Sequence, residues 1–226
     1  MSTSEDLALA SFAEIGYARV PRVLDAAQLE LGEALLSSVP SSRAGTRTLL
    51  ADPRARALAQ ALSAEPRLAT LLGDAARAIQ CTAFAKAPER NWLVGLHQDL
   101  SLPTEALGDT GDADAGAAKE GLRFAQPPAA ILQQLVAVRL HLDDCGADDG
   151  PLRVVPGSHC DGILEHTAAL ALRDARGEHA CLLARGDALV FRPLLLHASS
   201  KSTSGRRRAV LHFLFAPASL DHSARD

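Results

Sequence analysis

Two short stretches of the chain each pair a histidine with an aspartate at a spacing that suits metal binding. The first is "LHQDL", with His97 and Asp99, and the second is "RLHLDD", with His141 and Asp143. Residues two apart on a β-strand project from the same face, so either pair could present an imidazole nitrogen and a carboxylate oxygen to one cation. A second histidine would complete a face of two imidazoles and one carboxylate. Such a face suits ferrous iron with open positions and could also hold zinc.

The candidate for that further histidine is His197, in "RPLLLHASS", where an apolar run ends and small polar residues begin. Arg208 follows eleven residues later and opens the apolar run "AVLHFLF". An arginine that enters a sheet is costly unless it meets an anion, which is either an internal Asp or Glu or the carboxylate of a bound small diacid. Three of the remaining histidines are expected to be solvated: His166, His179 and His222. We expect His159 to support a turn, and His212 to pack in the core or behind the metal ligands.

Size and composition place the chain among ordinary globular proteins. Its 226 residues are 47% hydrophobic and 22% charged, with a net charge of −4, which argues against a nucleic acid or an anionic membrane held by bulk charge. No apolar run approaches the ~18–20 residues that span a bilayer, and the N-terminus lacks the layout of a signal peptide. The four cysteines form no C-x-x-C pair. We therefore expect a soluble cytoplasmic protein with free, buried thiols, as a monomer or small homo-oligomer.

The elements that must position these residues change in character near residue 78. Before it, residues 1–77 are predicted to form a mainly helical flank, with "YARV" as a short edge strand. The predicted helices are "SEDLALASFAEIG", "LDAAQLELGEALLSSV", "PRARALAQALSA" and "PRLATLLGDAARAI". After it, short segments rich in Val, Leu and Phe, several with period two, alternate with Pro, Gly and Asp. This pattern favours a sandwich or a closed double-sheet barrel.

One long segment interrupts the predicted strands. Residues 101–130 are rich in Gly, Ala, Asp and Pro and show little periodicity. A loop of this length in a compact domain is usually functional or disordered. Because it directly follows the first His-x-Asp triplet, we expect a lid over the site, with a solvated insertion as the alternative.

Four motifs together resemble the phytanoyl-CoA dioxygenase family of iron(II)- and 2-oxoglutarate-dependent oxygenases. They are "HQD", "LHLDDCGADDGPLRVVPGSH", "GDALVFRPLLLHASS" and "RRRAVLHF". The resemblance implies a mainly β fold, the double-stranded β-helix (a cupin-like jelly roll), with N-terminal helices. It implies one domain over residues 1–226, with the jelly-roll core at 78–216. It also implies that His97, Asp99 and His197 bind the metal, and that His141 and Asp143 belong to a strand without metal ligands.

The same resemblance implies roles for residues around the metal. Arg208 would bind the distant carboxylate of 2-oxoglutarate, with Arg207 as the alternative if the strand is shifted by one residue. An aspartate at position 99, where related halogenases carry a small residue, favours oxygenation over halogenation. The tentative co-substrate and pocket residues are Ser199, Trp92, Phe84 and Lys86.

The expected function is therefore that of a hydroxylase using Fe(II), 2-oxoglutarate and O2, with succinate and CO2 as co-products. Its substrate would be a small organic molecule or a carrier-bound acyl or amino-acid group. The alternatives are a metal-dependent cupin-type isomerase or small-molecule binding protein without oxygen chemistry, and a non-catalytic jelly-roll module. Arg208 distinguishes the hydroxylase from the isomerase, because an isomerase has no general need of a residue that binds a dicarboxylate.

Overall fold

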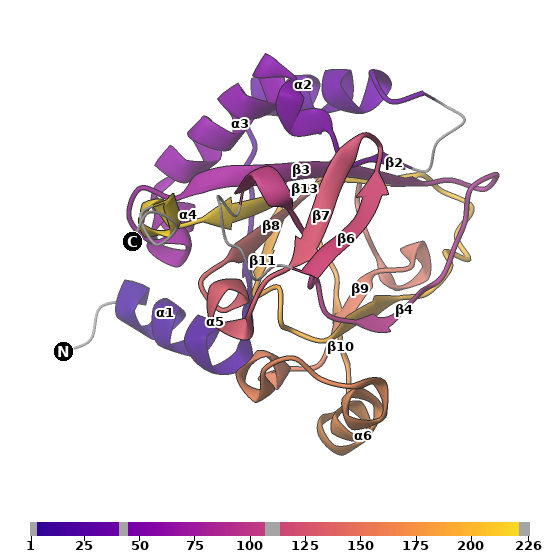
Figure 1. The fold of residues 1–226 in the computed structure, drawn as a ribbon. Helices are drawn as coiled ribbons and strands as arrows, with labels where there is room; N and C mark the ends of the chain where they lie inside the picture. Colours follow the sequence, from indigo (N-terminus) through magenta and orange to yellow (C-terminus); the bar gives the residue numbers. More distant parts are fainter. Residues whose placement is uncertain (1–3, 41–44, 107–113, 222–226) are drawn as a thin grey trace.

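The computed structural model describes residues 4–40, 45–106 and 114–221 (Figure 1). The α-helices are α1 (Ser4–Ile15), α2 (Ala26–Ser37), α3 (Pro53–Ala64), α4 (Pro66–Leu72), α5 (Ala129–Leu132) and α6 (His166–Arg176). The strands are β1 (Tyr17–Val20), β2 (Gly45–Thr46), β3 (Arg77–Lys86), β4 (Val94–His97), β5 (Leu102–Pro103), β6 (Asp114–Lys119), β7 (Leu122–Gln126), β8 (Val136–His141), β9 (Leu152–Val154), β10 (His179–Cys181), β11 (Ala188–Phe191), β12 (His197–Ser199) and β13 (Arg208–Ala216).

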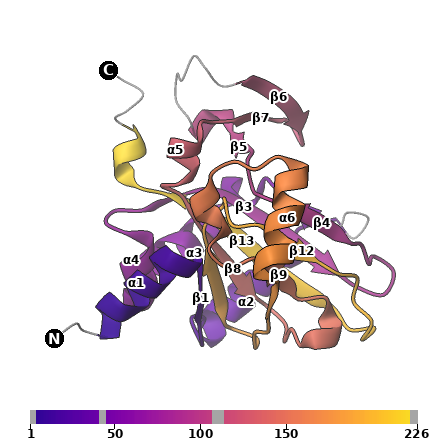
Figure 2. The same ribbon diagram turned by 90° about the horizontal axis from the view of Figure 1, so that it is seen from below.

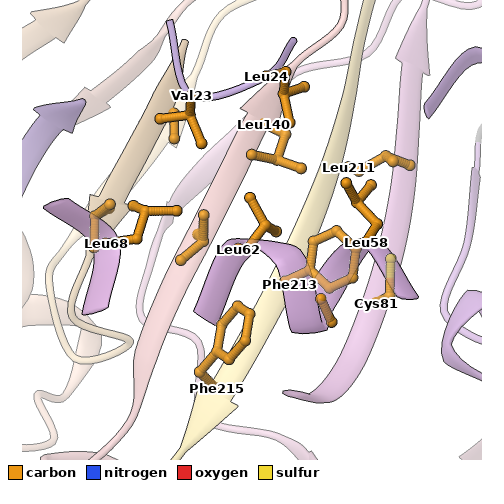
Figure 3. Close-up of a cluster of buried hydrophobic side chains, with 14 of the residues drawn as sticks. Val23, Leu24, Leu58, Leu62, Leu68, Cys81, Leu140, Leu211, Phe213 and Phe215 are labelled. Carbon is orange, nitrogen blue, oxygen red and sulfur yellow. The ribbon is translucent and has the colours of Figure 1, made fainter. Parts of the chain in front are cut away.

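The largest sheet has six antiparallel strands in the order β1-β11-β8-β13-β3-β2. Helices α2 and α3 lie over one face of it, above β3 and β13 in Figure 1. Alternate residues of the strands pack there against the helices, since the side-chain period of a strand is two. Figure 3 shows part of this buried cluster, which includes Leu58, Leu62, Leu140, Leu211 and Phe213.

The opposite face of the large sheet packs against a second sheet, in the order β10-β9-β12-β4 (Figure 2). Leu189, Phe191 and Leu214 of the large sheet share a buried cluster with Leu152 and Val154 of the smaller one. Two antiparallel sheets packed face to face, with the chain passing between them, form the double-stranded β-helix predicted from the sequence.

Helix ends follow local rules, with one correction to the sequence prediction. Helix α3 has the predicted bounds, because Asp52 caps its N-terminus by accepting a hydrogen bond from the backbone N–H of Arg54. The fourth predicted helix is too long: α4 ends at Leu72, Gly73 follows with φ +80°, and β3 begins at Arg77. Helix α6 was not predicted, because only Ala169 is buried along its length.

The interrupting segment is more regular than its composition predicted. Strands β5, β7 and β6 form a third sheet, and α5 follows it. Leu102 and Phe124 from this sheet are buried and line the central cavity. The carboxylate of Glu120, between β6 and β7, accepts hydrogen bonds from Thr46 and from the backbone N–H of Arg47. The part of the predicted lid at 107–113 lies outside the described residues.

Two further expectations concern the whole chain. Within the described ranges, no helix is both long enough and apolar enough to cross a membrane. All four cysteines are free, and Cys81, Cys145 and Cys181 are buried as predicted, whereas Cys160 is exposed.

Candidate metal centre and cavity

The two sheets bring His97, Asp99 and His197 together. His97 is the last residue of β4 and His197 is the first of β12, and the two are paired across these antiparallel strands. Their ring centroids are 4.2 Å apart. The potential ligand atoms of all three residues lie within 4.8 Å of one another. Residues one hundred positions apart thus converge on one point at the inner face of the smaller sheet.

Hydrogen bonds orient both imidazole rings. Nδ1 of His97 lies 2.8 Å from the carbonyl oxygen of Gly95, and Nδ1 of His197 lies 2.8 Å from that of Leu195. A carbonyl oxygen only accepts, so each Nδ1 carries the proton and each Nε2 has a free lone pair. Each Nε2 lies 3.7 Å from a carboxylate oxygen of Asp99. Two imidazole nitrogens and a carboxylate, with the other ring nitrogen bound to backbone, are a donor set that fits a divalent transition metal.

The electrostatics of the cluster favour the protonation states that bind a cation. Burial lowers the pKa of His197 to about 4, which keeps its imidazole neutral. Burial works to raise the pKa of Asp99, but the neighbouring His197, His212 and His97 hold it below its ordinary value. Metal binding requires a neutral imidazole and an ionised carboxylate, so His197 and Asp99 need no large proton rearrangement at neutral pH.

Two buried side chains hold the backbone around the cluster. Gln98, whose side chain points away from those of its neighbours, donates from Nε2 to the carbonyls of Leu194 and Gly162, each at 2.7 Å. The hydroxyl of Ser158, in the "PGSH" motif, accepts from the backbone N–H of Leu196 at 2.8 Å. Both contacts fix the segment that leads into β12. Sequence reasoning missed them, because neither residue type signals such a role.

The second His-x-Asp triplet lies elsewhere. Both ring nitrogens of His141 are buried without a hydrogen-bond partner, and this histidine is not part of the described metal-ligand cluster. The carboxylate of Asp143 accepts from Arg207 and from the backbone N–H of Ala209. His159 also lies apart, with Nε2 3.0 Å from a carbonyl of α1.

Arg208 is 2% exposed and lines the same cavity as the cluster. Its Nη2 donates to the carbonyl oxygen of Gly150 at 2.9 Å, and its Nε to that of Asp149 at 3.4 Å. The Asp149 carboxylate instead pairs with Arg206, and none of the described carboxylates lies within 4.0 Å of the Arg208 guanidinium. Burial lowers the pKa of Arg208. The sequence predicted either an internal Asp or Glu or a bound diacid as the partner of Arg208. Among the described residues, no internal Asp or Glu takes this place.

Gly150 explains part of the "DDGP" motif. Its φ is +64°, and a Cβ added there would lie 2.5 Å from the carbonyl oxygen of Ser200. Only glycine has this conformation without strain and fits this close approach. The motif therefore presents a backbone carbonyl to the arginine of a distant strand.

The adjacent Arg207 points out of the cavity, to Glu33 and Asp143, which it contacts at 2.8 and 2.7 Å. Lys86 lies opposite Arg208 across β3 and β13, and its Nζ donates to the hydroxyl of Ser199 at 3.1 Å. Burial and the charges of Arg208 and Arg139 lower the pKa of Lys86 to about 8.

The cavity that joins these groups has a volume of about 400 Å³. All three tentative pocket residues, Trp92, Phe84 and Lys86, line it, as does Ser199. So does His212, whose Nε2 lies 3.7 Å from Asp99 and whose pKa burial lowers to about 4. Arg139 also lines the cavity and was overlooked in the sequence, although it is the lone charge in the apolar run "LVAVRLHL".

Known proteins share both sequence and fold with this chain. An L-proline trans-4-hydroxylase from Streptomyces griseoviridis is 31% identical over a stretch covering 34% of this chain and 38% of that enzyme. Among solved structures, the α-ketoglutarate-dependent epimerase SnoN from nogalamycin biosynthesis has a TM-score of 0.69, at 16% identity over 95% of this chain and 81% of SnoN. EctD from S. alaskensis, solved with 2-oxoglutarate and 5-hydroxyectoine, has a TM-score of 0.68, at 18% identity over 96% of this chain and 77% of EctD.

The structural similarities, at such low identity, establish the shared double-stranded β-helix. The sequence carries the finer assignment: the family model described as "Phytanoyl-CoA dioxygenase (PhyH)" matches residues 12–210, which include every residue of the metal-ligand cluster and Arg208. With that match, the chain belongs to the phytanoyl-CoA dioxygenase family.

Proposed function

We propose that this protein is an Fe(II)- and 2-oxoglutarate-dependent dioxygenase that hydroxylates a small organic molecule. One observation carries the proposal: the cluster His97, Asp99 and His197 and the uncompensated guanidinium of Arg208 open into the same cavity. A metal-ligand cluster alone would suit many activities. Its combination with a buried cation that has no carboxylate partner in the described chain suits a dicarboxylate co-substrate.

In this proposal His97 and His197 bind Fe(II) through Nε2 and Asp99 binds it through a carboxylate oxygen. Iron so bound would supply the dioxygen chemistry that couples the oxidation of 2-oxoglutarate to succinate and CO2 with oxidation of the substrate. The carbonyls that hold both Nδ1 atoms keep the rings in place before the metal binds, so little ordering is left to the binding step.

Arg208 would hold the distant carboxylate of 2-oxoglutarate. The carbonyl of Gly150 fixes its guanidinium, so the arginine is oriented without being neutralised. Ser199, on the strand that begins at His197, supplies a hydroxyl beside Lys86 for a further hydrogen bond to the co-substrate. Buried apolar side chains, among them Phe191 and Phe124, keep bulk water away from the rest of the cavity.

We infer that the described chain works as one domain, since α2, α3 and α4 share a hydrophobic cluster with the large sheet. A cavity of about 400 Å³ suits 2-oxoglutarate with a small substrate. Free L-proline is the first compound to test, because of the similarity to the L-proline trans-4-hydroxylase. The epimerase activity named for SnoN makes the outcome of oxidation a separate question.

The first test needs no substrate. Under anaerobic conditions Fe(II) and then 2-oxoglutarate are added, and the weak visible charge-transfer absorption of the chelated co-substrate is measured. We expect the band in the wild type and its loss in His197→Ala. Iron-loaded protein that gives no band would overturn the proposal in favour of a metal-dependent isomerase or binding protein.

A second test separates hydroxylation from other 2-oxoglutarate-dependent outcomes. Candidate compounds are incubated with Fe(II), 2-oxoglutarate and O2, and succinate is quantified beside the mass of the product. Hydroxylation predicts a product that gains one oxygen atom per succinate formed. A product of unchanged mass would indicate epimerisation.

A further inference from the structure

A second arginine faces the cavity from the middle of the large sheet. Arg139 lies on β8, between Leu189 of β11 and His212 of β13, and every residue of β8 is buried. Its side chain lines the cavity and is 8% exposed. A guanidinium in this position costs stability unless an anion meets it.

Within the described chain, Arg139 has no such anion. Its Nε is buried without a hydrogen-bond partner, and its guanidinium contacts the face of Phe84, 5.7 Å from the ring centroid. No described carboxylate lies within 4.0 Å of it. Burial, and next the charge of Arg208, lower its pKa to about 9. At neutral pH the cavity wall therefore holds a charged guanidinium whose Nε–H has no hydrogen-bond partner.

The charges of the loaded site leave this arginine uncompensated. With Fe(II) and 2-oxoglutarate bound as proposed, the positive charges are the two of the metal and one each of Arg208 and Arg139. The negative charges are one of Asp99 and two of the co-substrate, so the site keeps one excess positive charge. A protonated Lys86 adds a further positive charge. Excess buried charge of one sign is unfavourable, so the last molecule to enter should bring a negatively charged group to Arg139.

The positions on the strands separate Arg139 from the co-substrate clamp. Arg208 is paired with Lys86 at the start of β13, whereas Arg139 is paired with His212, four residues further along. Four residues of strand place the backbones of Arg208 and Arg139 roughly 13 Å apart along the sheet. The row of His212 also lies close to Asp99, because His212 Nε2 is 3.7 Å from that carboxylate. The Arg139 side chain thus starts from the row beside the metal. Its guanidinium reaches over Phe84, which is paired with Val210, midway between the His212 and Arg208 rows, so Arg139 faces the cavity from beside the path to the metal.

We propose that Arg139 binds the substrate, and that the substrate is a small organic acid whose carboxylate contacts this guanidinium. The inference rests on the proposed function, since it assumes that Arg208 and the metal together hold 2-oxoglutarate. Phe84 and Phe191, which also line the cavity, would contact the apolar part of the acid. The substrate class is then one with a free carboxylate, which includes a free amino acid such as L-proline, rather than a compound that lacks this group.

The test uses the Fe(II)- and 2-oxoglutarate-loaded protein without O2, so that no turnover occurs. Acetate is the probe and acetamide its uncharged match, with sodium chloride added to equalise ionic strength. Trp92 is the single tryptophan of the chain and lines the cavity, so its fluorescence reports binding, beside the charge-transfer band. We expect a saturable response to acetate and none to acetamide.

The variants Arg139→Gln and Arg139→Lys test the assignment to this residue. In Arg139→Gln, acetate should bind about tenfold more weakly or not at all, as expected when a charge-assisted hydrogen bond is lost. The affinity for 2-oxoglutarate should stay within about twofold of wild type, and Arg139→Lys should keep part of the acetate response. Arg173→Gln, on the exposed helix α6, is the matched control and should behave as wild type.

Three outcomes would overturn the inference. The loaded wild type could fail to bind acetate, or could bind acetamide equally well, and neither result depends on a variant folding. Alternatively, Arg139→Gln could lower the affinity for 2-oxoglutarate and leave the affinity for acetate unchanged, which would show that Arg139 binds the co-substrate. Failure of the proposed function itself would look different, because 2-oxoglutarate would then produce no charge-transfer band in the wild type.

Discussion

Replacing Arg208 by leucine should separate the function of this residue from the stability of the fold. In the unloaded protein the Arg208 guanidinium is buried with two backbone carbonyls and no described carboxylate. Removing a buried charge that lacks a counterion relieves a desolvation cost of several kcal/mol. The two carbonyls left unpaired cost about 1–3 kcal/mol each. These effects oppose each other, so we expect the unloaded Arg208→Leu variant to melt near the wild-type temperature or above it.

With Fe(II) and 2-oxoglutarate bound, the melting temperatures of the wild type and Arg208→Leu should differ far more. Loss of a charge-assisted contact to a carboxylate costs about 2–5 kcal/mol, which corresponds to a dissociation constant raised about 30-fold to several-thousand-fold. At a co-substrate concentration one hundred times its dissociation constant, the wild type gains about 2.7 kcal/mol. For a chain of this size that is a rise of about 5–11 °C in melting temperature. The variant should show no more than about a third of this rise at the same concentration.

The assay is thermal unfolding followed by circular dichroism, without O2, with Fe(II) alone and with Fe(II) plus 2-oxoglutarate. Iron content measured in both proteins controls for the metal site, which Arg208 does not touch. The reasoning would be refuted if the unloaded variant melted far below the wild type while 2-oxoglutarate still raised its melting temperature by the wild-type amount. Arg208 would then be a structural residue and the co-substrate would bind elsewhere.

Three other perturbations test the surrounding structure. His97→Ala should abolish iron binding whereas His141→Ala should retain it, as measured by iron content after anaerobic loading, and the reverse pattern would favour the second triplet. Gly150→Ala should lower the melting temperature, because a left-handed alanine costs about 1–2 kcal/mol and its Cβ meets a carbonyl oxygen. The same variant should bind 2-oxoglutarate more weakly, and unchanged affinity would show that the Gly150 carbonyl does not orient Arg208. Burial chiefly lowers the pKa of Lys86 from its ordinary 10.5 to about 8, so between these values the unfolded chain holds a proton that the folded one has lost. Stability relative to Lys86→Met should therefore rise as pH increases through this window, measured by urea unfolding, and a flat difference would contradict the shifted pKa.

How far the sequence predicts the structure depends on whether a residue's role is local. The strand Tyr17–Val20 and the helix Pro53–Ala64 were predicted with their observed bounds, because periodicity and capping are local signals. The fourth helix was overextended, since "DAARAI" retains helical spacing although Gly73 ends the helix. Composition also failed for residues 101–130, where the tight hairpin of β6 and β7 and its pairing with β5 order a segment that shows no clear alternation.

The candidate site shows the same division. Spacing alone left His97 and His141 as rivals, and only the family resemblance chose between them. Arg139 has no local signal beyond one charge in an apolar run, and only the structure shows that it lines the cavity with its Nε unpartnered. Gln98 has its role through carbonyls that are distant in sequence, which no local pattern reveals.

The six-stranded sheet is bounded on both sides by strands from the first third of the chain, β1 at one edge and β2 at the other. Without β1, the backbone groups of β11 that face it would be unpaired, and without β2 those of Ala83 and Phe84 in β3 would be unpaired. Unpaired edges of this kind are where sheets of separate molecules join. The N-terminal segment therefore does more than cover one face of the core with helices. It also pairs with the whole of β11 and with Ala83 and Phe84 of β3, so the segment that builds one layer of the core also limits the backbone that the sheet offers to another molecule.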